Sequence, residues 1–216
     1  MLKLDGLDVS IGSVSVLRGV SMDVPDGKFT GLIGRNGAGK TTLMRSVMGL
    51  LAPTAGSIVF DGNEFGKIPT HVRARGGIGY MPEDRRLVPD MTVEENVLLP
   101  AWSGGNKDPA QRLQEIYTMI PEVREFAQRK ALQLSGGQQK LVALARALMC
   151  GTKLLLLDEP FEGVAPVLAA RLAEVIASLR DGGVAIVLTE SGISHSRELL
   201  DRIYTVDRGE VSLLEG

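Results

Sequence analysis

The chain has 216 residues, 44% hydrophobic and 4% aromatic, and its formal net charge is −2. This length can bury a substantial core, and a near-neutral chain with few aromatic residues gives no support for a nucleic-acid partner. Cys150 is the only cysteine, which excludes an internal disulfide and a cysteine-built zinc site. The start of the chain lacks a signal-peptide core, and no apolar run approaches the ~18–20 residues that cross a bilayer. We expect a cytoplasmic chain that acts at a membrane only through a partner.

The N-terminal part reads as strands. Residues 2–10 and 15–24 carry apolar side chains at near-alternate positions and are separated by Gly12, and a Pro-Asp-Gly turn follows them. This pattern predicts antiparallel strands that lead into a buried strand at residues 29–33. Further short strands are predicted at residues 56–62 and 78–82.

A glycine-rich loop directly follows the strand at residues 29–33. Its sequence has two glycines five residues apart, then Lys and a hydroxyl residue, which is the phosphate-loop pattern. The loop consists of Gly34, Arg35, Asn36, Gly37, Ala38, Gly39, Lys40 and Thr41. A helix beginning at about Gly39 would direct unpaired N–H groups at a phosphate, Lys40 would reach the β- and γ-phosphates, and Thr41 would bind Mg²⁺. An ordinary glycine-rich turn is the alternative, and the flanking strand and helix favour the phosphate loop.

Residues 87–134 differ in pattern from the segments around them. Thr92 and Glu95 form a capping-box sequence at a helix start, and residues 108–120 carry an apolar stripe at helical spacing. We expect one domain, residues 1–216, with a core at 1–86 and 135–216 and a helical subdomain at about 87–134.

The C-terminal half alternates helices and strands. A helix is predicted from Ser135 to about Met149, followed by a four-leucine strand at residues 154–157. Continuously apolar strands are buried on both faces, as in parallel sheets. The remaining predicted elements are helices at 167–179 and 194–200, a strand at 184–189, and an antiparallel pair at 202–206 and 210–214. The predicted fold class is α/β: a P-loop NTPase core of mainly parallel sheet with an antiparallel β edge and an inserted α-helical subdomain.

Two carboxylates end the four-leucine strand. Asp158 follows it directly, at the strand end where ligands bind in open α/β sheets, and is expected to hold Mg²⁺. Glu159 is then positioned to polarise an attacking water as general base. A phosphate loop combined with such a pair is the two-part site of a nucleoside triphosphatase. A strand-end turn with solvated carboxylates is the open alternative.

A second anion-binding surface is predicted at the start of the helix that begins at Ser135. Ser135, Gly136, Gly137 and Gln138 offer a hydroxyl and glycine amides at a helix N-terminus, apart from the metal ligands. Two such surfaces with one set of metal ligands predict a head-to-tail dimer, in which each triphosphate lies between two subunits. A simple helix cap at Ser135 is the alternative.

Leu-Ser-Gly-Gly-Gln at residues 134–138, with the phosphate loop before it and the Asp-Glu strand after it, resembles the ATP-binding subunit of ABC transporters. Residues 88–96 and 159–166 look most like the branched-chain amino acid (LivF-type) import subfamily. The resemblance implies ATP and Mg²⁺ as ligands, with Thr42 among the nucleotide-binding residues. It also implies a second, identical or related ATPase subunit, transmembrane permease subunits fed by a substrate-binding protein, and a position on the inner face of the plasma membrane.

Several positions depart from the family pattern. Ile11 stands where an aromatic residue normally stacks on adenine, which implies weaker and less base-selective binding. Glu83 replaces a glutamine that contacts Mg²⁺ and still offers oxygen ligands. Glu190 replaces a γ-phosphate-contacting histidine and is therefore a candidate catalytic residue, but its carboxyl must be protonated, bridged or turned away. His195 is too far along the chain to substitute, and Ala165 replaces an aspartate that communicates across the dimer.

Because Lys40, Thr41, Asp158 and Glu159 are intact, we expect ATP hydrolysis that is slow in the isolated chain. A soluble ABC protein acting on ribosomes or DNA, and a weakly hydrolysing regulatory subunit, stay open as alternatives. Residues 87–120 are expected to form a membrane-facing groove for a coupling helix of the permease. The transported substrate does not follow from the sequence.

Overall fold

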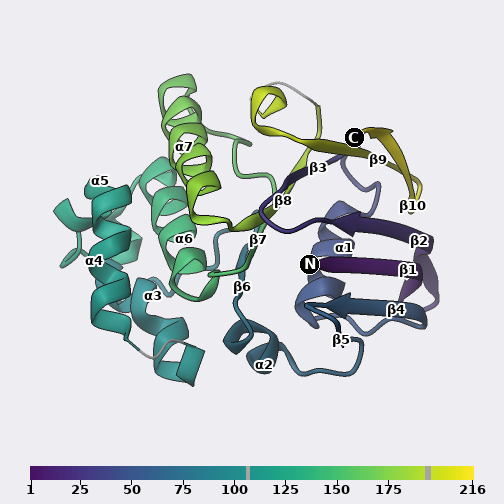
Figure 1. The fold of residues 1–216 in the computed structure, drawn as a ribbon. Coiled ribbons are helices and arrows are strands. Elements are labelled where there is room, and N and C mark those ends of the chain that lie inside the picture. The colour runs from purple at the N-terminus through teal and green to yellow at the C-terminus, as the bar shows by residue number, and fades with distance from the viewer. Residues whose placement is uncertain (106–107, 193–195) are drawn as a thin grey trace.

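The computed structural model describes residues 1–105, 108–192 and 196–216. A helical layer covers one face of a central sheet, and α1 with a second sheet covers the other face (Figure 1). The strands are β1 Leu2–Ile11, β2 Val14–Val24, β3 Phe29–Ile33, β4 Ala55–Phe60, β5 Asn63–Glu64, β6 Ile78–Met81, β7 Leu154–Leu157, β8 Ala185–Glu190, β9 Arg202–Asp207 and β10 Glu210–Glu215. The α-helices are α1 Lys40–Met48, α2 Thr70–Arg75, α3 Val93–Pro100, α4 Pro109–Met119, α5 Pro121–Glu125, α6 Gly136–Cys150 and α7 Pro166–Ser178.

The central sheet has six strands in the order β10-β9-β3-β8-β7-β6. Strands β9, β3, β8, β7 and β6 run parallel, and β10 pairs antiparallel with β9 at the edge. The predicted mainly parallel sheet with an antiparallel edge is therefore confirmed. The carboxyl ends of the parallel strands lie at one edge of the sheet, where α/β proteins bind ligands.

Strand β7 illustrates why the central sheet is so apolar. Its four leucines are fully buried, and successive side chains of a strand point to opposite faces. Leu155 and Leu157 join the core under the helical layer, whereas Leu154 and Leu156 join the core around α1 and the second sheet. Because both faces are covered, every position of this strand must be apolar.

The second sheet has the order β2-β1-β4-β5 and is antiparallel. The antiparallel pairing of the first two strands is confirmed. They do not extend the sheet that contains β3, however. Apolar side chains such as Leu2 and Leu4 of β1 pack inward against α1, so this helix lies between the two sheets.

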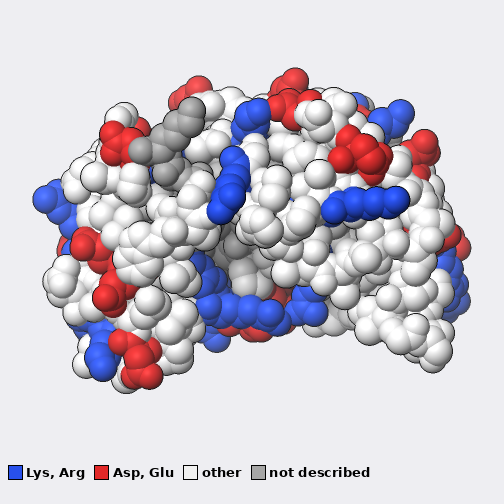
Figure 2. All heavy atoms as spheres, turned by 90° about the horizontal axis from the view of Figure 1, so that it is seen from below, with Lys and Arg blue, Asp and Glu red and all other residues white. Residues whose placement is uncertain are grey.

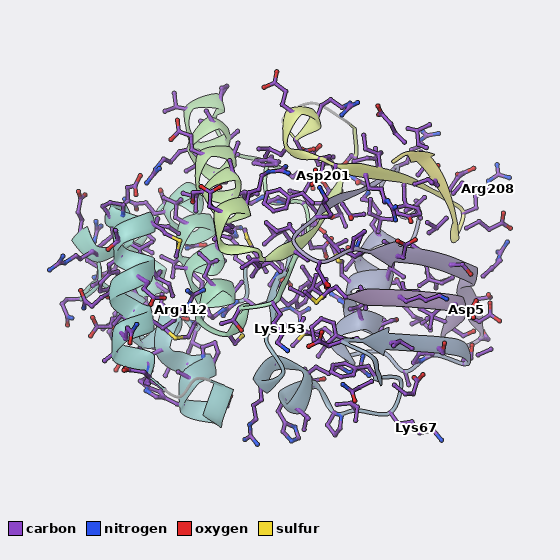
Figure 3. The ribbon with its side chains drawn as sticks, in the orientation of Figure 1. Asp5, Lys67, Arg112, Lys153, Asp201 and Arg208 are labelled. Carbon is purple, nitrogen blue, oxygen red and sulfur yellow. The ribbon has the colours of Figure 1, made fainter. Side chains whose placement is uncertain are left out.

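The helical layer begins at the predicted cap. The Thr92 hydroxyl accepts a hydrogen bond from the Glu95 N–H at 3.2 Å, and the Glu95 carboxylate accepts from the Thr92 N–H at 2.8 Å. Helix α3 continues into a π-helical turn at Ala101–Gly105. Arg112 of α4, labelled in Figure 3, donates two hydrogen bonds to the Leu148 carbonyl and so fastens α4 to α6.

Helix α2 was not predicted, because it is short and its apolar residues do not recur at helical spacing. A buried cation secures it instead: the Arg73 guanidinium, 1% exposed, donates to the carbonyls of Ser46 and Val47 at the end of α1. The predicted helix at 194–200 falls partly outside the described residues, and Arg197–Leu199 forms a 3-10 turn. Short 3-10 turns also occur at Ala131–Gln133 and Arg180–Gly182. Across the described residues, no helix combines the length and apolar composition that crossing a membrane requires.

Candidate functional site

The glycine-rich loop connects β3 to α1 and forms a cradle of backbone amides. Gly37 and Gly39 have φ angles of 80° and 116°, which side-chain-bearing residues rarely adopt. A Cβ at Gly39 would also lie 2.8 Å from the Leu17 side chain. Lys40 is the first residue of α1, so the free N–H groups of the first helical turn face the same space as the loop.

The Lys40 ammonium lies at the floor of this cradle and is only 5% exposed. It donates to the carbonyl oxygens of Gly34 at 2.5 Å and Arg35 at 3.2 Å. Its Nζ atom also lies 3.0 Å from Oε1 of Glu159. The structure therefore brings the phosphate-loop lysine and the predicted general base into one buried ion pair, although they are 119 positions apart in the sequence.

Asp158 is fully buried just beyond the end of β7 and receives three hydroxyl hydrogen bonds. The donors are Thr189 at 2.8 Å, Thr41 at 3.2 Å and the Tyr80 phenol at 3.3 Å. Burial raises the pKa of the Asp158 carboxyl, and these three hydrogen bonds oppose the shift. The oxygen atoms of Thr41 and Asp158 converge, as the predicted Mg²⁺ site requires.

Residues of the loop, Thr41 and Glu159 surround a cavity of about 290 Å³, and Asp158 lies just outside its lining. The side chains and backbone atoms that line it come from Val16, Asn36, Gly37, Gly39, Lys40, Thr41, Thr42, Glu83 and Glu159. Glu83 adds a carboxylate whose pKa is raised by partial burial and by the nearby carboxylates of Glu162, Asp158 and Glu159. Most of the predicted nucleotide-binding residues of the loop thus share one cavity with the predicted general base.

Oxygen donors at this cavity fit a magnesium ion. Among the described residues, no group of three or more His, Cys, Asp or Glu side chains is arranged to hold a metal by itself. Mg²⁺ is commonly bound by one or two carboxylates together with substrate phosphates, so such a group is not needed. Thr41, Asp158 and Glu83 are the residues that would hold it.

Ile11, the predicted adenine contact, lies away from the cavity. Ile11 is 48% exposed at the β1–β2 hairpin and does not line the cavity, whereas Val16 of β2 does. Sequence reasoning missed Val16, because the hairpin and its bulged register decide which side chain reaches the loop. Its backbone also lies against the turn at Gly209, where a Cβ would fall 2.0 Å from the Val16 carbonyl oxygen.

Glu190 ends β8 beside the phosphate loop, and its carbonyl accepts the Gly34 N–H at 3.1 Å. Its carboxylate is buried and accepts a hydrogen bond from the Ser196 hydroxyl at 2.6 Å. Glu190 is absent from the cavity lining, which fits the alternative of a carboxyl that is turned away. Its catalytic role stays a prediction, and His195 lies outside the described residues.

Ser135 and the glycines after it form the N-terminus of α6. The Ser135 hydroxyl accepts the Gln138 N–H at 3.3 Å, and the Gln138 side chain accepts the Ser135 N–H at 3.0 Å, so a capping box is present. Gly137 packs closely, since a Cβ there would lie 2.4 Å from the Leu168 side chain. Ser135 and Gly136 are exposed and do not line the cavity of their own chain.

Thr189 is a site residue that the sequence analysis did not identify. Its hydroxyl donates to Asp158 and accepts the Glu159 N–H at 2.9 Å, and the side chain is fully buried. The register of the parallel pair explains this contact, because Leu157 of β7 lies opposite Leu188 of β8. Ser191, two residues further on, also contacts the site: its hydroxyl forms hydrogen bonds of 3.1 Å with the side chains of Asn36 and Glu159.

Comparison with known proteins places this site in a family. Residues 17–162, more than half of the chain, match the family described as ABC transporter. The branched-chain amino acid transport ATP-binding protein BraG of Pseudomonas aeruginosa is 35% identical over 98% of this chain and 91% of its own length. The lipopolysaccharide export ATP-binding protein LptB of Haemophilus influenzae is 34% identical over 98% of this chain and 88% of its own. A probable LivF of Archaeoglobus fulgidus is 32% identical, over 98% and 90%.

Solved structures agree with the sequence relatives. A nucleotide-free ATP-binding cassette from an ABC transporter superposes with a TM-score of 0.89 and 27% identity, covering all of this chain and 91% of the other. The dimeric bacterial ABC transporter cassette MJ0796 gives the same TM-score and identity, with both chains fully covered. The chain belongs to the ABC transporter family, as one of its ATP-binding, ATP-hydrolysing subunits.

Proposed function

We propose that this chain hydrolyses ATP to power a membrane importer for branched-chain or other hydrophobic amino acids or related small molecules. The observation that carries the proposal is the cavity that phosphate-loop residues, Thr41 and Glu159 line together, with Asp158 hydrogen-bonded to Thr41 beside it. The names of BraG and LivF support the transported class. The proposed location is the inner face of the plasma membrane, in contact with permease subunits that a substrate-binding protein supplies.

The ion pair between Lys40 and Glu159 defines how the site would respond to ATP. A γ-phosphate offers Lys40 a stronger partner than the carbonyls of Gly34 and Arg35, and so draws its ammonium away from Glu159. The freed carboxylate can then accept a proton from the attacking water. Bound Mg²⁺ would supply neutralisation of phosphate charge.

The exposed α6 terminus supports a head-to-tail dimer. Ser135 and Gly136 offer a hydroxyl and amides but do not line the cavity of their own chain, so the γ-phosphate they would bind is that of a neighbouring subunit. The dimeric cassette among the structural relatives has the same fold. The partner subunit would be identical or a related ATPase.

A groove of about 560 Å³ is the proposed docking surface for the permease. It was expected from residues 87–120 alone, but it lies between α3, α6 and the core elements α1, α2 and β6. Its apolar lining includes Leu50, Leu99 and Pro100, and its polar lining includes Arg86 and Arg146. Figure 2 shows a hollow near the middle of this side of the molecule, bordered by Lys and Arg side chains. This combination suits a short helix that carries apolar and acidic residues.

Export is the rival function, because LptB is nearly as similar to this chain as BraG. Solubilised membranes that contain the tagged chain would be used for affinity purification, and the co-purifying membrane subunits identified by mass spectrometry. Permeases with a periplasmic binding protein support import. Subunits of a lipopolysaccharide export system overturn it.

The hydrolytic role is tested with two variants. Glu159→Gln is expected to lower turnover by about 10²- to 10⁴-fold while ATP binding survives, since this is the usual contribution of a general base. Lys40→Ala is expected to abolish ATP affinity. Full turnover in the Glu159→Gln variant, or unchanged affinity in the Lys40→Ala variant, would contradict the site. Adding the partner ATPase to the wild type should raise turnover, whereas the regulatory alternative predicts none with or without it.

A further inference from the structure

Lys140 of α6 is a buried cation that the phosphate site does not use. Its side chain is 5% exposed, and its ammonium donates to the backbone carbonyls of Glu162 at 2.5 Å, Glu159 at 2.7 Å and Pro160 at 3.2 Å. An ammonium has three N–H donors, so all three are engaged by one turn of backbone. Burying a cation is costly unless it is fully hydrogen-bonded, which makes this contact specific to the turn after β7.

The turn that Lys140 holds contains a strained residue. Glu159 has a φ of 48°, in the left-handed region that non-glycine residues seldom occupy. Such conformations persist where the surrounding structure over-determines them, and they gather at functional sites. The Glu159 N–H is held by Thr189, and its carbonyl is held by Lys140 and by the Glu162 N–H at 3.2 Å.

We propose that Lys140 is a positioning residue that keeps Glu159 in this left-handed conformation and thereby aims its carboxylate into the cavity. Thr189 fixes only the N–H side of Glu159, and without the ammonium the Glu159 carbonyl would keep only the longer hydrogen bond from the Glu162 N–H, at 3.2 Å. The inference rests on the proposed function, in which Glu159 is the general base. The inference goes beyond the proposed function because it assigns the alignment of the general base to a side chain on another element, helix α6.

Helix α6 carries both Lys140 and, at its start, the surface proposed to meet the neighbouring subunit's ATP. Lys140 is five residues after Ser135 on the same α-helix, a rise of about 7–8 Å. A displacement of the first turn of α6 therefore moves the ammonium and the carbonyls bound to it. The surface proposed to meet the neighbouring subunit's ATP is in this way rigidly joined to the Glu159 of its own chain.

The test is a double-mutant cycle between Lys140→Met and Glu159→Gln, measured as ATP turnover at saturating ATP. Lys140→Met keeps the apolar stem and removes the cation. We expect kcat to fall about 10²-fold, because a misplacement of about 1 Å in a catalytic group has that effect, while the Kd for ATP is unchanged. In the Glu159→Gln background, where turnover is slow and is measured by single-turnover assays over hours, Lys140→Met should cause no further loss of turnover.

Lys153→Met is the matched control. Lys153 is a cation that forms an ion pair with the Asp61 carboxylate, but its side chain is half-exposed and it directly precedes β7, at the end of the strand opposite to Glu159 (Figure 3). Its turnover should equal that of the wild type. If Lys140→Met does not fold, Lys140→Gln, which keeps an amide donor, enters the same cycle under the same criteria.

The outcomes separate the two proposals. Unchanged kcat in the Lys140 variant, or an equal loss repeated in the Glu159→Gln background, overturns the positioning role and leaves the proposed function intact. Full turnover in Glu159→Gln alone overturns the proposed function, and the Lys140 inference with it. A loss of kcat that disappears in the Glu159→Gln background supports both.

Discussion

Thr189→Val tests whether the strand-end hydroxyl network holds the site together. Valine keeps the shape of threonine but removes the oxygen that donates to Asp158 at 2.8 Å and accepts the Glu159 N–H at 2.9 Å. Asp158 retains Thr41 and Tyr80 as donors, so the larger penalty falls on the buried N–H of Glu159. Losing a net hydrogen bond and leaving a buried N–H unpaired should lower the free energy of unfolding by about 2–4 kcal/mol.

The assay is urea unfolding at pH 7, monitored by circular dichroism. The slope of the unfolding free energy against urea concentration should be the same in variant and wild type. Thr189→Ser is the control: it keeps the hydroxyl and removes one methyl group, which should cost about 1 kcal/mol. ATP turnover should fall in the valine variant and persist in the serine variant. A valine variant as stable as the serine variant would refute the reasoning, because the hydroxyl would then contribute nothing.

Three further predictions concern other parts of the molecule. Glu122→Gln should cost about 0.5–1 kcal/mol at pH 7 through its partly exposed ion pair with Arg171, whose hydrogen bond lowers the pKa of Glu122 from 4.5. This contribution is present above pH 4.5 and is lost as the pH falls through the lowered folded-state pKa, so urea unfolding curves of variant and wild type should converge in acid. Burial raises the pKa of Cys150 to about 11, so iodoacetamide at pH 8 should react ~10²-fold more slowly with native than with urea-unfolded protein; equal rates would contradict the burial. Leu50→Glu in the groove should abolish co-purification with membrane subunits while ATP binding persists; Leu214→Glu, at another exposed leucine on β10, should not.

The groove also changes how the docking surface should be tested. Charge reversal at Glu94 and Glu95 would be the natural experiment from sequence alone. In the structure, however, Glu95 completes the α3 capping box and Glu94 accepts a hydrogen bond from the Tyr117 hydroxyl at 2.8 Å. Reversal there would disturb helix α3 as well as the surface, whereas Leu50 lines the groove without such a bond.

The sequence by itself determined the features that depend on neighbouring residues. The glycine-rich loop before Lys40, the capping box at Thr92, the helix start at Ser135 and the apolar strand before Asp158 each follow from local geometry or from burial on both faces of a strand. These local patterns were enough to predict the fold class and the family resemblance.

Only the tertiary structure decided which distant groups meet. Thr189 reaches Asp158 because β7 and β8 pair in one register, and a shift by a single residue would point that side chain to the other face. Val16 rather than Ile11 lines the cavity because the bulged hairpin sets its position, and Lys140 meets the turn at Glu159 through helix packing. None of these contacts leaves a local pattern in the chain, because each depends on the packing of elements that lie far apart in sequence.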